Sequence, residues 1–233
     1  MISFNQASVV SHDGATILHP FSLELAEQRI AVIGANGSGK STLARLINGL
    51  VEPSSGTVTI GAADTSTPAL DTVADGSAVR RAVGFVFTDP AAQLIMPTVI
   101  EDVELSLRRE HRRAEDRRQA ALAALARFGL DGFAERSVHG LSGGQQQLLA
   151  IATVLATGPR ILVTDEPTTL LDLRNTRIIG DLLTSLTQQV VIVTHNLELA
   201  ARTDRALVVD QGRIVFDGAP AAAIAHYRDS VAA

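Results

Sequence analysis

The sequence predicts an α/β fold built on a mostly parallel sheet, and two observations support it. Short apolar runs alternate along the chain with longer helical patterns, which is typical of successive β-α-β units. The runs are apolar throughout, as expected of strands that are covered on both faces. The chain has 233 residues, of which 46% are hydrophobic. This composition suffices for one large domain, or for one domain with a small subdomain.

Five apolar runs are predicted as buried strands of the parallel sheet, at 29–34, 83–87, 160–165, 189–195 and 205–210. Helical patterns follow several of them, at 40–50, 143–157, 171–187 and 196–202. These helices are expected to connect neighbouring parallel strands and to cover the faces of the sheet.

Other segments depart from this alternation. The first 28 residues suggest antiparallel strands, divided by a turn signal at 12–14. Residues 61–79 are small and polar and are expected to form a surface loop. Residues 98–128 have a helical pattern that no strand interrupts, which predicts a helical subdomain between two halves of the core. Near the end, a turn signal at 211–212 predicts a small hairpin.

The composition excludes several kinds of site. The sequence has no cysteine, and therefore no disulfide scaffold and no thiolate metal site. Its formal net charge of −5 gives no reason to expect nucleic-acid binding by bulk electrostatics. No signal peptide is expected, since no basic segment precedes an apolar run at the N-terminus. No apolar run approaches the roughly 18 residues of a membrane span, so the chain is expected to be soluble or held at a membrane by partners.

The charged residues carry two further signals. Among the 20 basic residues only Lys40 is a lysine, so chemistry that needs a primary amine has one candidate. The run RREHRRAEDRR at 108–118 is dense in charge. It predicts either a solvated helical face with i,i+4 ion pairs or a contact with anionic lipid headgroups.

A glycine-rich segment after the strand at 29–34 carries the strongest motif. GANGSGKS matches G-x-x-x-x-G-K-[ST], follows a predicted strand and opens a predicted helix. In such a P-loop, backbone N–H groups surround phosphate oxygens and the helix N-terminus adds partial positive charge. Lys40 is expected to reach the β- and γ-phosphates, and Ser41 to ligate Mg²⁺. The predicted nucleotide-binding residues are Gly34, Ala35, Asn36, Gly37, Ser38, Gly39, Lys40, Ser41 and Thr42.

Two acidic residues and a histidine follow buried strands. Asp165 and Glu166 end the run ILVTDE, at the carboxyl edge where open α/β sheets bind ligands. Asp165 is predicted to hold Mg²⁺ through water, and Glu166 to orient or deprotonate an attacking water. His195 ends the strand at 189–195 at the same edge. Alone it predicts a structural or capping residue, whereas beside a P-loop it is a candidate contact for the γ-phosphate.

The segment LSGGQ at 141–145 contains a conflict. Ser142 and Gln145 have the spacing of a capping box, which predicts that a helix begins there. Gly143 and Gly144 then occupy its first turn, where alanine would favour the helix by about 1 kcal/mol per residue. Glycine there lets a ligand approach the backbone N–H groups, which predicts a second anion site. The two sites share one nucleotide only if the second comes from another subunit.

These motifs resemble those of the ATP-binding-cassette (ABC) ATPases. GANGSGKST, LSGGQ, ILVTDEP, Asp172 in TTLLD and His195 in VTH stand in the order typical of that family, and the resemblance covers nearly the whole chain. It implies an ABC ATPase fold with an α/β P-loop NTPase core. The antiparallel β part would comprise residues 1–28 and 54–62, and the helical subdomain residues 95–157 with the signature motif.

The resemblance also implies hydrolysis of ATP with Mg²⁺ by a dimer. Two such domains close head-to-tail, and each ATP lies between the P-loop of one and the LSGGQ of the other. Ser142, Gly143, Gly144 and Gln145 would therefore bind ATP in trans, and Asp172 would lie in the D-loop. Intact motifs in one chain are compatible with a homodimer that has two active sites.

Finer details resemble the ATPases of energy-coupling-factor (ECF) importers. They are the segments NGSGKSTLARLINGL, DPAAQLIMPTVIEDV at 89–103 and DEPTTLLDLRN at 165–175. The resemblance implies uptake of a vitamin, with the biotin type favoured, or of a transition-metal ion as in cobalt and nickel importers. The implied partners are a transmembrane coupling subunit and a substrate-binding membrane subunit. The implied location is the cytoplasmic face of a bacterial membrane, as a peripheral protein.

Three positions depart from the usual pattern of the family, and the mildest is Thr164, which replaces an apolar residue before Asp165. Thr88 stands where the Q-loop usually has glutamine, and Gln93 follows five residues later. Either residue could serve the role of that loop, which senses Mg²⁺ and contacts the membrane partner. His12 stands in the early loop that usually supplies an aromatic ring to stack on adenine, so His12 is the candidate for that contact.

Two other function classes remain to be weighed. A non-transport ABC ATPase could act on DNA or on ribosomes, but the chain lacks a coiled-coil insertion and a second cassette, and its charge is acidic. A GTPase would need a second lysine in N-K-x-D, and small-molecule kinases on P-loops lack LSGGQ. The sequence therefore favours the motor subunit of a membrane importer.

Overall fold

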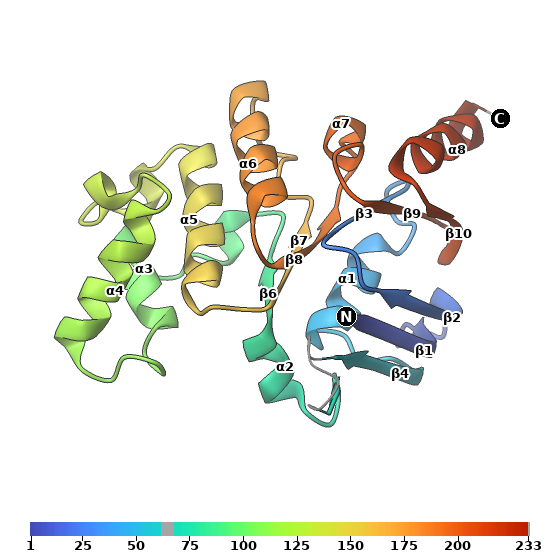
Figure 1. Cartoon of the computed structure of the whole chain (residues 1–233), viewed down its shortest axis with the longest axis horizontal. Helices are drawn as coiled ribbons and strands as arrows, with labels where there is room; N and C mark the ends of the chain where they lie inside the picture. The colour runs from blue at the N-terminus through green and yellow to red at the C-terminus, as the bar shows by residue number, and fades with distance from the viewer. Residues whose placement is uncertain (62–67, 233) are drawn as a thin grey trace.

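The computed structural model describes residues 1–61 and 68–232, which form two sheets flanked by helices (Figure 1). The larger sheet has the strand order β10-β9-β3-β8-β7-β6. Its strands are β3 (Arg29–Ile33), β6 (Val83–Val86), β7 (Ile161–Asp165), β8 (Gln189–Val193), β9 (Arg205–Asp210) and β10 (Arg213–Gly218). All neighbours are parallel except β10, which is antiparallel to β9. The predicted α/β fold with a mostly parallel sheet is confirmed.

The smaller sheet is antiparallel and has the order β2-β1-β4-β5. Its strands are β1 (Ile2–Val10), β2 (Thr16–Leu25), β4 (Ser55–Ile60) and β5 (Leu70–Asp71). The antiparallel pairing of the first two strands is therefore as predicted, with the turn signal at 12–14 at the tip of their hairpin.

Helix α1 (Lys40–Asn48) lies between the two sheets and holds them together. Its Leu43, Leu46 and Ile47 are fully buried in a core that also contains residues of β1, β4, β7 and β8. Burying a leucine or isoleucine side chain contributes about 1.5–3 kcal/mol, so this apolar face fixes the start of α1 against the large sheet.

The opposite face of the large sheet is covered by α5, α6, α7 and α8 (Figure 1). These helices span α5 (Gly143–Ala156), α6 (Leu173–Ser185), α7 (Leu197–Ala200) and α8 (Pro220–Ala232). Three of them confirm predicted helices, and no end differs from the prediction by more than two residues. The sequence reading missed α8, which begins at a proline and buries only Ala223 and Ile224. Its alanine-rich pattern has too weak an apolar face to stand out.

Three helices form a separate layer beyond β6, with a hydrophobic core of their own. They are α3 (Val99–Ser106), α4 (Ala114–Ala126) and the N-terminal part of α5. The short 3-10 helix η1 (Pro90–Ala92) precedes α3, and η2 (Asp131–Phe133) and η3 (Val138–Gly140) lie between α4 and α5. The helical character predicted over 98–128 is confirmed, with a break at 107–113. The boundaries assigned to the three parts of the chain stay predictions.

The surface loop predicted over 61–79 is wrong for residues 70–71 and 76–79, and residues 62–67 lie outside the described residues. Residues 70–71 form β5, and α2 (Gly76–Ala82) begins before the loop was expected to end. The reason is tertiary, because Val79 is fully buried in the main core. The small polar residues around Val79 suggest a loop, because the sequence alone does not reveal that Val79 is buried.

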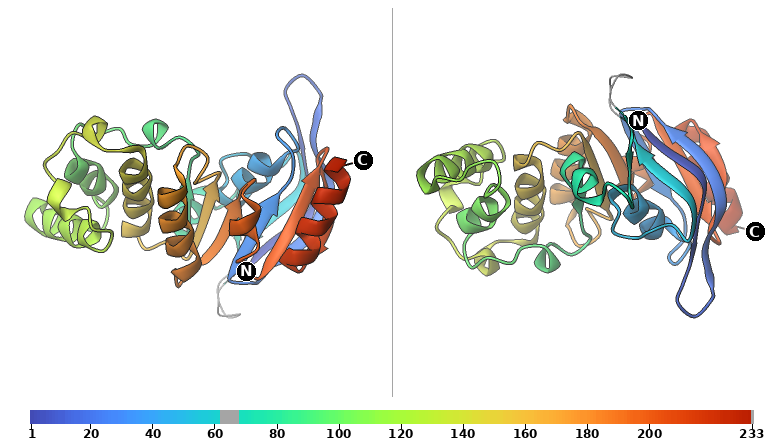
Figure 2. Two further views of the ribbon diagram at one scale, coloured as in Figure 1. Left: turned by 90° about the horizontal axis from the view of Figure 1, so that it is seen from above. Right: turned by 90° about the horizontal axis from the view of Figure 1, so that it is seen from below.

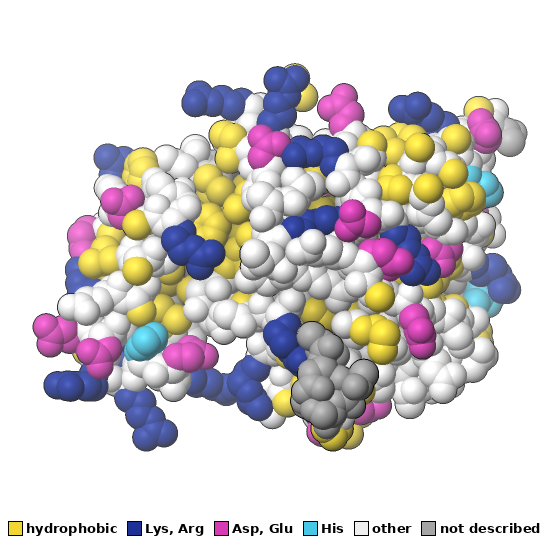
Figure 3. Space-filling view, viewed as in Figure 1, with side chains coloured by type: hydrophobic (Ala, Val, Ile, Leu, Met, Phe, Trp, Pro, Cys, Tyr) yellow, Lys and Arg dark blue, Asp and Glu magenta, His cyan; other side chains and the backbone are white. Residues whose placement is uncertain are grey.

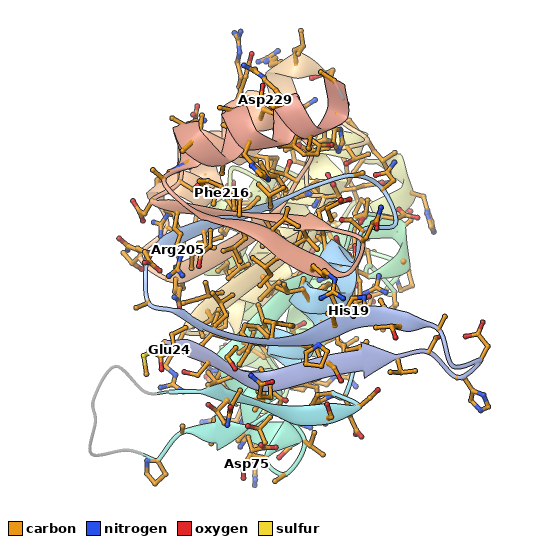
Figure 4. All side chains as sticks on the ribbon, turned by 90° about the vertical axis from the view of Figure 1, so that its right-hand side faces the viewer. His19, Glu24, Asp75, Arg205, Phe216 and Asp229 are labelled. Carbon is orange, nitrogen blue, oxygen red and sulfur yellow. The ribbon has the colours of Figure 1, made fainter. Side chains whose placement is uncertain are left out.

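The C-terminal hairpin is joined to the rest of the molecule by Arg205 (Figure 4). Its guanidinium donates to both carboxylate oxygens of Asp217 at 2.6 Å and to Glu27 at 3.1 Å. These hydrogen bonds raise the pKa of Arg205. The predicted turn is confirmed, with φ of 45° at Gln211 and 72° at Gly212. In the described part of the chain, no helix combines the length and apolarity that a membrane crossing requires.

Candidate functional site

The site lies where three neighbouring strands of the large sheet end. Strands β7, β8 and β3 are adjacent and parallel, so their carboxyl ends meet at one edge. The P-loop follows β3, Asp165 ends β7, and His195 follows β8. Residues that are far apart in the sequence therefore lie close together at this edge, because their strands are neighbours in the sheet.

The P-loop takes a backbone path that glycine permits. Gly34, Gly37 and Gly39 have φ of 147°, 77° and 105°. A Cβ on Gly34 would lie 2.0 Å from the backbone oxygen of Val209, and one on Gly39 would lie 2.8 Å from Leu18. Gly34 and Gly39 are thus required by close packing on β9 and β2, whereas Gly37 faces open space.

We expect Gly34→Ala to destabilise the protein by about 3 kcal/mol, since it adds a backbone collision to an unfavourable φ. Gly37→Ala should cost only about 1 kcal/mol, because the left-handed conformation is its sole penalty. Urea unfolding of both variants measures the difference. Equal losses of stability would contradict the packing role of Gly34.

Lys40 is the first residue of α1, and only 6% of its surface is exposed. Its Nζ donates to the carbonyl oxygen of Ala35 at 2.7 Å, so the ammonium lies inside the loop. Burial lowers the pKa of Lys40, and the charges of Glu166 and Asp165 oppose that shift. A cavity of about 210 Å³ lies beside this ammonium. It is lined by Ile17, Asn36, Gly37, Gly39, Lys40, Ser41, Thr42 and Glu166.

Asp165 is nearly inaccessible to solvent and accepts a hydrogen bond from Ser41. The distance between Ser41 Oγ and Asp165 Oδ1 is 2.8 Å. Arg45 of α1 approaches the other carboxylate oxygen at 3.6 Å. Burial raises the pKa of Asp165, and the Ser41 hydrogen bond and the Arg45 charge partly offset the rise. A bound cation would relieve this desolvation.

Glu166, which lines the cavity, forms a hydrogen-bonded pair with His195. Glu166 has φ of 52°, and its N–H donates to the carbonyl oxygen of Val193 at 2.9 Å. This strained turn directs the carboxylate toward His195, whose Nδ1 lies 2.8 Å from Glu166 Oε2. Thr169 Oγ1 donates to the same oxygen at 3.1 Å. The pair is the arrangement expected of a positioned base.

Thr88 and Gln93 both support the loop after β6, but in different ways. Thr88 Oγ1 donates to the backbone oxygen of Asp165 at 2.9 Å. Gln93 Oε1 accepts from the Phe87 N–H at 3.1 Å, and its Nε2 donates to the Phe85 carbonyl at 3.4 Å. Thr88 therefore contacts the candidate site, whereas Gln93 braces the loop from within.

The signature segment begins α5 with the predicted capping box. Gln145 N–H donates to Ser142 Oγ at 3.3 Å, and Ser142 N–H donates to Gln145 Oε1 at 2.9 Å. A Cβ on Gly143 would meet nothing within 4 Å, whereas one on Gly144 would lie 2.4 Å from the side chain of Asn175. Packing against Asn175 in the same chain therefore explains the glycine at position 144, whereas no contact within the chain explains the glycine at position 143.

The structure does not bring the signature segment to the P-loop of the same chain. None of residues 142–145 lines the cavity beside Lys40. Figures 1 and 2 place the start of α5 and the P-loop on different parts of the molecule, with the ends of β7 and β8 between them. The two predicted anion sites are separate within one copy.

Asp172 and His12 also lie outside that cavity. Asp172 caps α6, where its Oδ1 accepts from the Asn175 N–H at 2.8 Å. His12 is exposed at the tip of the β1–β2 hairpin, which projects from the molecule in Figure 2. Ile17 of β2 lines the cavity instead. The adenine contact of His12 stays a prediction.

Comparisons with known proteins identify the family. Residues 18–169 match the family described as ABC transporter. The chain belongs to the ABC transporter family. It is 42% identical to the biotin transport ATP-binding protein BioM of Rhizobium etli over 231 residues, 99% of each chain. It is also 40% identical over 197 residues to the energy-coupling factor transporter ATP-binding protein EcfA2 of Methanospirillum hungatei, covering 83% of this chain and 48% of that protein.

Solved ABC ATPases share the fold. The cbiO1 protein of Clostridium perfringens, part of the ABC transporter complex cbiONQ, superposes with a TM-score of 0.82 at 28% identity, covering 96% of this chain and 90% of that one. A dimeric ATP-binding cassette bound to ADP and Pi superposes with a TM-score of 0.80 at 32% identity, covering 94% of this chain and 99% of that one. ABC ATPases bind ATP and hydrolyse it to power transport, so this chain is an ABC ATPase.

Sequence reasoning missed four residues that this ABC cassette places at the site. Ile17 lines the cavity, Arg45 approaches Asp165, Thr169 bonds Glu166, and Asn175 packs on Gly144. Thr169 and Asn175 lie within four residues of predicted site residues, so proximity was an available signal. Ile17 carried no such signal, because only the packing of β2 brings it to the P-loop.

Proposed function

We propose that this chain is the ATP-hydrolysing motor subunit of an ECF-type membrane importer, with biotin as the favoured cargo. One observation carries the proposal, namely that Lys40, Ser41 and Glu166 line one cavity at the edge of the sheet. Ser41 bonds Asp165 and Glu166 bonds His195 directly behind that lining. These are the side chains that cleavage of a phosphoanhydride requires at a P-loop.

The P-loop would bind the phosphates of ATP with the backbone of residues 34–42 and with Lys40. The residues present fit Mg²⁺, since Ser41 Oγ and Asp165 Oδ1 are oxygen donors 2.8 Å apart. The ion would neutralise charge on the β- and γ-phosphates. Asp165 would hold it through water, because its buried carboxylate gains a counter-charge in doing so.

Glu166 would orient or deprotonate the attacking water, and His195 would hold Glu166 in place and contact the γ-phosphate. The 2.8 Å hydrogen bond between the two side chains supports this division of roles. A lone carboxylate at the mouth of the cavity would have several rotamers, and the bonds from His195 and Thr169 select one of them.

A second copy of the chain would complete the site with Ser142, Gly143, Gly144 and Gln145. Two features support a homodimer. Gly143 has space above it that nothing in its own chain fills. Leu170 and Leu173, on either side of Asp172, are 66% and 81% exposed. Such apolar side chains beside the D-loop suit an interface between copies.

The membrane partner would dock in a groove between β6 and the helical layer. The groove has a volume of about 260 Å³ and is called the partner groove below. It is lined by Asn48, Leu50, Arg80, Val83, Gly84, Phe85, Phe87, Ser106, Thr153, Val154 and Thr157. The Phe87 N–H donates to Gln93 Oε1, and Thr88 Oγ1 donates to the backbone oxygen of Asp165. The loop therefore links the groove to the site, which suits transmission of the ATP-driven movement.

We expect Leu50→Arg to weaken co-purification with the transmembrane coupling subunit and to leave the ATPase of the purified subunit within about twofold. Leu50 is 44% exposed in the partner groove, so a charge there affects docking more than folding. Val215→Arg is the control, because Val215 is 43% exposed on β10, outside the groove. Equal effects of both variants on co-purification would contradict the assignment of the groove.

Cargo is tested by uptake in cells that carry the whole transporter. Cells with the intact chain should accumulate labelled biotin, and cells with Lys40→Ala should not, because the ammonium beside the cavity is lost. Identification of the co-purified membrane subunits gives the cargo independently. Uptake of cobalt or nickel in place of biotin would overturn the biotin assignment and leave the motor function intact.

A further inference from the structure

We propose that an arginine cluster beside the partner groove binds anionic lipid headgroups of the membrane. The arginine cluster consists of Arg108, Arg109, Arg112 and Arg113, in the connection between α3 and α4. All four are exposed, and none forms a salt bridge with another described residue. Against the single Glu110, they give residues 108–113 a net charge of +3 in a chain of net charge −5.

The acidic residues that are close in the sequence form no ion pair with the cluster among the described residues. Arg118 pairs with Glu135 and lies 3.7 Å from Glu104. Glu115 and Asp116 occupy the first turn of α4, where the helix dipole favours them. The arginine cluster is therefore uncompensated locally. Dark-blue side chains project at the lower left of Figure 3, where Figure 1 places the connection between α3 and α4.

The connection is held in a fixed conformation, so it presents the arginines without a large ordering cost. Leu107 is buried in the core of the helical layer. The His111 N–H donates to the Leu107 carbonyl at 2.9 Å, and Arg117 Nη1 donates to the His111 carbonyl at 3.1 Å. A prearranged cluster binds better than a disordered one of equal charge.

The position of the cluster relative to the partner groove indicates which ligand it binds. Ser106, two residues before Arg108, lines the partner groove, and Arg80 lines the same groove from α2. If a transmembrane subunit docks there, which rests on the proposed function, the cluster lies on the membrane-facing side. Guanidinium groups bind phosphate in bidentate fashion, and each basic residue near an anionic surface strengthens binding about fivefold.

Vesicle flotation of the purified full chain tests the proposal. The protein should bind vesicles of phosphatidylcholine with phosphatidylglycerol, should not bind phosphatidylcholine alone, and should dissociate at high salt. Replacing Arg108, Arg109, Arg112 and Arg113 by glutamine should lower binding by about tenfold or more. The control variant replaces the exposed Arg174, Arg177, Arg213 and Arg228 by glutamine and should retain binding.

Three outcomes would overturn the proposal. The intact chain could ignore anionic vesicles, or the two quadruple variants could lose binding equally, which would indicate bulk charge. Loss of the membrane subunit by the first variant, with vesicle binding unchanged, would assign the cluster to a protein contact. ATPase activity is measured on the same samples and tests the proposed motor function separately from lipid binding. Absence of hydrolysis would contradict the motor function, whereas loss of vesicle binding alone would not.

Discussion

Glu166→Gln is expected to lower ATP hydrolysis by about a hundredfold or more and to leave ATP binding intact. General-base catalysis contributes about 10²–10⁴ in rate, and glutamine cannot accept the proton of the attacking water. The amide keeps the size of the carboxylate and can still bond Thr169 and His195, so the cavity retains its shape. Phosphate release under excess MgATP measures the loss.

The same variant should accumulate as a dimer when ATP is present, because the closed state is left only after hydrolysis. Size-exclusion chromatography with and without MgATP detects this shift. Glu198→Gln is the matched control, since Glu198 is an exposed glutamate in the first turn of α7, three residues after His195. Normal turnover by Glu166→Gln would rule out the general-base role, and a monomer in ATP would contradict the closed dimer.

Gly143→Asp is expected to abolish hydrolysis while the isolated subunit stays folded and binds ATP. Its side chain would meet nothing within 4 Å in its own chain, and an acidic residue suits the first turn of a helix. In a closed dimer the carboxylate would face the γ-phosphate of the ATP bound to the other copy. A like charge there opposes the transition state, and a drop of about a hundredfold or more is expected.

Thermal unfolding with and without ATP checks that folding and binding survive, and phosphate release measures turnover. Gly132→Asp is the control, because Gly132 also faces open space but lies in η2. Gly144→Asp would be a poorer test, since its side chain collides with Asn175 of the same chain. Full activity of Gly143→Asp would show that the signature segment does not act on a second copy.

Local pattern predicted most of the large sheet. Strand β7 was recognisable because a short, mostly apolar run ends in Asp165, and β3 because its apolar run leads into the P-loop. Where local pattern was weak, prediction failed. Helix α8 buries only two small or medium side chains on β9, and the segment with Val79 consists mostly of small and polar residues, with core contacts from Leu70 and Val79. Tertiary packing decides only the segment with Val79, because the alanine-rich α8 follows its own helix preference.

The candidate site was predicted in its chemistry but not in all its contacts. The motifs identified Lys40, Asp165 and Glu166, because phosphate binding and hydrolysis restrict the usable residue types. They did not indicate that Thr88 would bond the backbone of Asp165, or that Gln93 would bond Phe87. Those contacts depend on the path of one loop, which sequence spacing does not specify.

The sequence by itself determined the family, the P-loop and the acidic pair of this protein, because each depends on residue types at short spacing. Only the tertiary structure decided the reasons for the two signature glycines. Gly144 is required by Asn175, which is 31 positions away in the sequence and reaches it only because α6 packs on α5. Gly143 has no neighbour in its own chain. Contacts between distant segments follow from the packing of whole helices and strands, and local pattern does not encode them.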